Sequence, residues 1–107
     1  MAMTLRERIK HPEADLELAR QIVLQGLAGY PAKVFLFGSH ATGRAKRASD
    51  IDIAILPEND LPDTVFADIR ERLEESQIIY LVDLLNLLIA GETLRARVLA
   101  EGVPWNA

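Results

Sequence analysis

The spacing of apolar and polar residues along this chain predicts three helices and three strands. Apolar residues recur every three or four positions in segments 12–27, 62–73 and 92–99, which predicts a helix in each. The apolar residues in these helices are Leu16, Ala19, Val23 and Leu27 in the first; Val65, Phe66, Ile69 and Leu73, an inner stripe, in the second; and Leu94, Val98 and Leu99 in the third. Runs rich in β-branched, aromatic and leucine residues predict strands over 33–37, 51–56 and 78–84. The order helix, strand, strand, helix, strand, helix predicts an α/β fold with a small mixed sheet of three to four strands flanked by helices.

The composition indicates one small domain, which we expect to span residues 1–107. Half of the residues are apolar, which excludes a disordered chain that could not build a core. The absence of cysteine excludes a disulfide scaffold, a thiolate metal site and a cysteine nucleophile. The apolar runs are too short to cross a bilayer, and the first ten residues lack the apolar core of a signal peptide. We therefore expect a cytoplasmic protein with no membrane partner.

Charge is distributed unevenly along the chain. Twelve basic and 16 acidic residues give a net charge of −4, which argues against a protein that coats nucleic acid. Four of the basic residues nevertheless fall within a short segment: Lys33, Arg44, Lys46 and Arg47. This local reversal of sign fits the attraction of phosphate, and Arg44 and Arg47 are our candidate phosphate ligands. The plainer alternative is that the loop charges are only solvated.

Three aspartates in or next to the predicted strands are candidate metal ligands. Asp50 and Asp52 are two residues apart, so they share a strand face and lie roughly 6–7 Å apart along it. Two carboxylates that close repel each other unless a cation lies between them, and their hard oxygens suit Mg²⁺ or Mn²⁺. Asp83 stands inside the third apolar run, where an acid is costly unless it is paired or bound to a metal. Asp50 could instead cap a turn.

Gly38-Ser39 follows directly on the first predicted strand. Glycine allows the backbone to approach a phosphate closely, and successive backbone N–H groups in such a turn attract anions. Taken alone, the pair could equally be a turn with a capping serine. Its position before a basic loop favours a triphosphate site.

The spacing of these residues resembles a known signature. Gly38-Ser39, ten intervening residues and Asp50-Ile51-Asp52 are similar to the motif of the DNA polymerase beta-like nucleotidyltransferase superfamily. The longer string from Phe37 to Ile53 resembles the minimal nucleotidyltransferase (MNT) domains. At average residue frequencies the four fixed positions recur by chance in roughly one such chain in a thousand. The sequence departs from the family at His40 and Thr42, where arginine is common.

The resemblance implies the polymerase beta-like fold and transfer of a nucleoside monophosphate to a hydroxyl acceptor. It implies ATP as substrate and two Mg²⁺ ions, for which Mn²⁺ can substitute. The residues implied are Asp50, Asp52 and Asp83 as catalytic metal ligands, with Gly38, Ser39, Arg44 and Arg47 binding the nucleotide. Such domains commonly act as antitoxins of HEPN-type helical toxins, which implies transfer of AMP to a tyrosine of the toxin.

Two other functions are open to the sequence. The chain could neutralise its partner by complex formation without catalysis. It could also modify small molecules such as aminoglycosides, although those enzymes usually carry a further substrate-binding domain.

Several remaining side chains have simple structural interpretations. The segment 84–89 contains more leucine than one strand face can bury, so we expect part of it at a homo- or hetero-oligomer interface. Tyr80 is predicted to lie in the third strand as a core residue, and Trp105 to fill the core or an interface. Asn86 is expected to make a turn at the strand end, and His40 to lie at the surface or beside phosphate.

Overall fold

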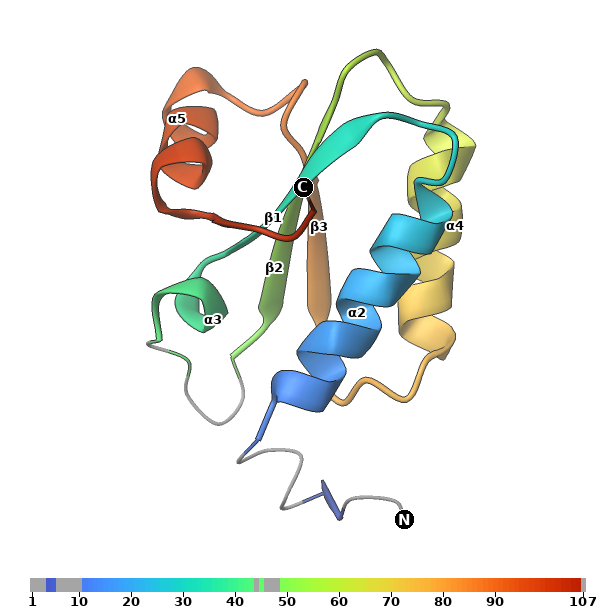
Figure 1. Cartoon of the computed structure of the whole chain (residues 1–107), viewed down its shortest axis with the longest axis vertical. Helices are drawn as coiled ribbons and strands as arrows, with labels where there is room; N and C mark the ends of the chain where they lie inside the picture. Colours follow the sequence, from blue (N-terminus) through green and yellow to red (C-terminus); the bar gives the residue numbers. More distant parts are fainter. Residues whose placement is uncertain (1–3, 6–10, 44, 46–48, 107) are drawn as a thin grey trace.

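The computed structural model describes residues 4–5, 11–43, 45 and 49–106. Its strands β1 (Ala32–Phe37), β2 (Ile51–Pro57), β3 (Val82–Asn86) and β4 (Val103–Pro104) form one sheet in the order β3-β2-β1-β4. β1 is antiparallel to β2 and to β4, whereas β2 and β3 are parallel. The helices are α2 (Glu13–Gly26), α3 (Ser39–Thr42), α4 (Asp63–Glu75) and α5 (Glu92–Glu101), and none in the described part could span a membrane. The predicted mixed sheet flanked by helices is confirmed (Figure 1).

The larger core lies between the sheet and the pair α2 and α4, which cover the same face (Figure 1). Ile51, Ile53 and Ile55 alternate along β2 and are fully buried on this side, as a strand period of two requires. Gly26 lets α2 approach α4, since a Cβ at this position would overlap the side chain of Ile69. The residues that the helical spacing placed inward on these two helices, apart from half-buried Leu16, are buried here.

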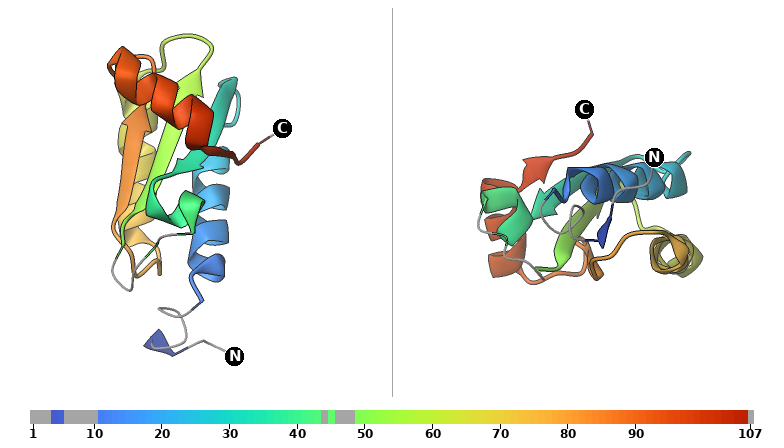
Figure 2. Two further views of the ribbon diagram at one scale, coloured as in Figure 1. Left: turned by 90° about the vertical axis from the view of Figure 1, so that its left-hand side faces the viewer. Right: turned by 90° about the horizontal axis from the view of Figure 1, so that it is seen from below.

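The opposite face of the sheet has a smaller core under α5. Phe35, Ala54, Leu87 and Val98 form it. Arg95 fixes the start of α5 because its Nε donates to the carbonyl of Leu87 at 2.8 Å. Figure 2 shows α5 lying across the strands, with the short helix α3 on the same face.

The third strand lies further along the chain than residues 78–84, so that prediction was wrong in position. The ladder with β2 starts where Ile51 pairs with Val82. The preceding segment is a loop, because the backbone N–H of Ile79 donates to a carboxylate oxygen of Asp15 at 3.0 Å instead of to a strand. Tyr80 is therefore a half-buried loop residue that packs against the core, not a strand residue.

The leucine-rich segment serves both cores. Leu84 is buried on the α2 and α4 side, whereas Leu87 is buried under α5. Between them, Asn86 makes the expected turn, since its Oδ1 accepts from the N–H of Leu88 at 3.0 Å. Ile89 is 82% exposed. Two cores thus account for most of the leucine, and an interface at this segment stays a prediction.

The C-terminal residues cover the edge of β1. The N–H of Trp105 donates to the carbonyl of Val34 at 2.8 Å, and the Trp105 side chain packs against the larger core. The Asn106 amide continues this pairing: its Oδ1 accepts from the N–H of Val34 at 2.9 Å and its Nδ2 donates to the carbonyl of Ala32 at 2.7 Å. Of the two places expected for Trp105, the structure selects the core.

Candidate active site

The turn that leaves β1 requires glycine. Gly38 has φ 75° and ψ −155°, a backbone conformation open essentially to glycine alone. A Cβ on Gly38 would also overlap the carboxylate of Asp52. The residue therefore brings the backbone at the start of α3 directly against a carboxylate of β2.

Two of the candidate ligands lie side by side in the sheet. Asp52 pairs with Phe37 of β1 on one side and with Asp83 of β3 on the other. Paired residues of neighbouring strands project from the same face, and such strands are about 4.8 Å apart. This face is opposite to that of the buried isoleucines of β2, so both carboxylates lie on the side that carries α3 and α5. Asp52 is half-buried and Asp83 is exposed.

Asp50 completes the acidic end of the sheet from just outside β2. It is exposed, and it lies close enough to Asp52 to act on that carboxyl group electrostatically. Burial raises the pKa of Asp52, as do the negative charges of Asp83 and Asp50, while His40 opposes this shift. The sum is an excess of negative potential, which a cation would relieve.

The donor set fits a metal that keeps part of its water shell. Within the described part of the chain, no three carboxylate or histidine side chains form a group that could hold a metal ion unaided. Mg²⁺ does not need such a cage, because it is commonly held by one or two carboxylates together with waters and substrate phosphates. Paired carboxylates beside a close backbone approach are consistent with that mode of binding.

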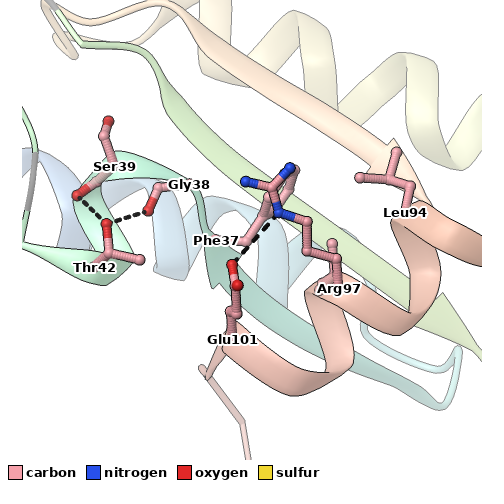
Figure 3. Close-up of a pocket in the computed structure, with 8 residues that line it drawn as sticks. Phe37, Gly38, Ser39, Thr42, Leu94, Arg97 and Glu101 are labelled. Carbon is pink, nitrogen blue, oxygen red and sulfur yellow. Dashed lines mark hydrogen bonds and ion pairs between the residues drawn. The ribbon is translucent and has the colours of Figure 1, made fainter.

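A cleft of about 440 Å³ opens beside Gly38, between α3 and α5 (Figure 3). Its lining residues are Phe37, Gly38, Ser39, Thr42, Leu94, Arg97, Val98 and Glu101. Because Phe37 is the strand partner of Asp52, the cleft lies on the face that carries the aspartates. Volumes of 300–1,000 Å³ are usual for small-ligand sites.

Comparison with known proteins supplies the family. The sequence model described as polymerase beta, nucleotidyltransferase matches residues 21–104. The chain belongs to this nucleotidyltransferase family. It is 31% identical over 93 residues to MntA of Haemophilus influenzae, a probable protein adenylyltransferase; the match covers 87% of this chain and 80% of MntA.

Comparison with solved structures also places this nucleotidyltransferase in the family. A minimal nucleotidyltransferase structure superposes with a TM-score of 0.68 at 30% identity and covers 85% of this chain and 93% of that one. A chain of a toxin-antitoxin crystal structure with AMP-PNP gives a TM-score of 0.65 at 27% identity, and covers 82% and 73%. The polymerase beta-like fold expected from the signature is thereby confirmed.

In this nucleotidyltransferase, His40 links α3 to the segment before β2. Its Nε2 lies 3.0 Å from the carbonyl oxygen of Ser49, and because a carbonyl only accepts, this nitrogen donates. The imidazole also meets the ring of Tyr80 edge-on, with centroids 5.4 Å apart. His40 is thus half-buried and holds the backbone next to Asp50, a role that the sequence did not suggest.

Two predicted nucleotide ligands of the nucleotidyltransferase, Arg44 and Arg47, lie outside the described residues, so their roles stay predictions. Conversely, sequence reasoning missed Arg97 and Glu101, which line the cleft. Their spacing of four residues was a weak signal, because such a pair on a helix is usually only a solvated face.

Proposed function

We propose that this nucleotidyltransferase transfers AMP from ATP to a tyrosine hydroxyl of a HEPN-type partner toxin and so acts as an antitoxin. The observation that carries the proposal is the juxtaposition of Gly38, Asp52 and Asp83 at one end of three adjacent strands. Family membership supports nucleotidyl transfer, and the name of MntA supports a protein acceptor. The toxin-antitoxin structure with AMP-PNP supports an adenine nucleotide as substrate and a toxin as partner.

Asp50, Asp52 and Asp83 are the proposed ligands of two Mg²⁺ ions, for which Mn²⁺ can substitute. When bound, such ions neutralise the phosphates and make the attacking oxygen more nucleophilic. Gly38 lets the carboxylate of Asp52 lie against the backbone at the start of α3, and Ser39 contributes polar donors for the polyphosphate there. Arg44 and Arg47 would add positive charge from the loop.

The reaction needs a proton acceptor near the incoming hydroxyl. We assign this role to a carboxylate oxygen of Asp83, which is exposed on the outer strand β3. The acceptor oxygen bonds to the α-phosphorus, the bond from that phosphorus to the bridging oxygen breaks, and pyrophosphate leaves. Positioning and charge neutralisation dominate catalysis of this kind.

The proposal is tested by incubating the chain with the product of its neighbouring gene, as the candidate toxin, together with Mg²⁺ and ATP labelled at the α-phosphate. We expect label on a toxin tyrosine with the wild-type chain, and none with D52N or D50N. Asp68→Asn, an exposed aspartate of α4 on the opposite face, is the matched control and should retain transfer.

Two outcomes would contradict the proposal. Label on RNA instead of the toxin would exclude a protein acceptor. Full neutralisation of the toxin by D50N and D52N would show that complex formation suffices, and the antitoxin would then act by binding alone.

A further inference from the structure

The cleft between α3 and α5 has a polar end and a charged end. Gly38 and Ser39 form the first, and Arg97 and Glu101 of α5 form the second. In Figure 3 the guanidinium of Arg97 extends from α5 toward the side of the cleft that carries Gly38, and the carboxylate of Glu101 points toward the guanidinium. Among the described lining residues, Arg97 carries the positive charge and Glu101 the negative charge.

Arg97 is held only loosely by its partner. Its Nε lies 3.5 Å from Oε2 of Glu101 across one helical turn, and its side chain is 73% exposed. Exposed pairs of this kind contribute little to stability, because water and salt screen them. A phosphate group offers more charge and matches the planar guanidinium, so it can displace the carboxylate.

Arg95, the other arginine of α5, has a structural role that Arg97 lacks. Arg95 donates to the carbonyls of Leu87, Leu88 and Ala90 at 2.8–3.2 Å, and so fixes the helix to the turn that follows β3. Arg97 makes no such backbone contact among the described interactions. Val98 is buried beside it and keeps this turn of α5 in place.

We propose that Arg97 contacts the polyphosphate of the bound nucleoside triphosphate, and that Glu101 holds the guanidinium until the nucleotide arrives. This inference rests on the proposed function and adds a specific ligand to it. The cleft favours the polyphosphate over the acceptor as the partner of Arg97. Gly38, which directly follows β1, lines the same cleft as Arg97, whereas Asp83 on the far strand β3 does not line it.

The test measures equilibrium binding of ATP, adenosine and inorganic tripolyphosphate to R97A, R97K and E101Q in the presence of Mg²⁺. R97A should lower the affinity for ATP and for tripolyphosphate about 10- to 100-fold, the range for loss of a charge-assisted contact. Its affinity for adenosine should be unchanged. R97K should recover part of the loss, and E101Q should bind ATP at least as tightly as wild type. Arg72→Ala, exposed on α4, is the matched control.

The outcomes separate this inference from the proposed function. If the wild-type chain binds ATP and R97A binds it equally well, Arg97 has no role and the proposed function stands. If R97A lowers the affinity for adenosine as much as the affinity for ATP, the contact is to the nucleoside and the inference is wrong. If the wild-type chain binds no ATP, the proposed function fails, and the inference fails with it.

Discussion

Replacing Gly38 with alanine would test the site most directly, because one added methyl group acts on a single catalytic candidate. The new Cβ would meet the carboxylate of Asp52 first. A carboxylate can rotate away, so the fold should survive while Asp52 leaves its position between β1 and β3. The change should therefore affect transfer far more than stability.

The backbone strain can be estimated separately. An alanine at φ 75° and ψ −155° costs about 1–3 kcal/mol, against a total stability of about 5–15 kcal/mol for a domain of this size. Gly29 is the matched control: its φ is 86°, and a Cβ there would meet nothing within 4 Å. It lies before β1, about 20 Å from Gly38 along six strand residues. Gly29→Ala should cost about 1–2 kcal/mol.

Urea unfolding and the labelled-ATP transfer assay, both on G38A and G29A, check this reasoning. We expect both variants to be folded, with stabilities within about 2 kcal/mol of each other. Transfer by G38A should fall about 100-fold or more, as displacement of a reacting group by about 1 Å can produce. Transfer by G29A should match wild type. A folded G38A with wild-type transfer would refute the role assigned to the Gly38–Asp52 approach.

Three further predictions concern stability. Burial and the charges of Asp83 and Asp50 raise the pKa of Asp52, so its ionisation destabilises the fold as pH rises through that pKa. Without divalent ions, D52N should therefore melt higher than wild type at pH 7, and the gain should vanish in acid below the ordinary aspartate pKa of about 3.9; an equal gain at both pH values would contradict this. Asp15→Ala should cost about 1–3 kcal/mol in urea unfolding, because the backbone N–H of Ile79 loses its acceptor; no loss would show that water replaces the carboxylate. Gly26→Ala should cost about 1–3 kcal/mol by overpacking α2 against α4, with transfer per folded molecule unchanged; a stabilised variant would show that the helices can separate freely.

The sequence was most informative where local pattern and chemistry coincide. In β2 the period of two places isoleucines on one face and Asp52 on the other, and the structure has this arrangement. The Gly38-Ser39 spacing to Asp50 and Asp52 predicted the family, because a turn and a strand must meet at one point for the chemistry. These features depend on residues close together in sequence.

The position of β3 depended on tertiary contacts instead. The apolar run from 78 to 88 fits a strand at several places, and no local residue marks where pairing begins. The buried carboxylate of Asp15, 4% exposed, accepts the N–H of Ile79 and keeps that segment out of the sheet. The position of Arg97 could not be predicted for a related reason, since only the packing of α5 on β1 brings this exposed residue to the cleft.

The order of the strands also indicates where the reacting groups of the proposed reaction would lie on the sheet. Gly38 directly follows β1, Asp52 lies on the inner strand β2, and Asp83 lies on β3 at the edge. The β- and γ-phosphates, the α-phosphate and the acceptor hydroxyl would then lie in that order from β1 to β3. Because Arg97 and Glu101 of α5 share the cleft with Gly38 next to β1, the acceptor side of the site is the edge strand β3. A partner protein that presents a tyrosine would therefore approach from β3, where it can reach Asp83 without displacing α5.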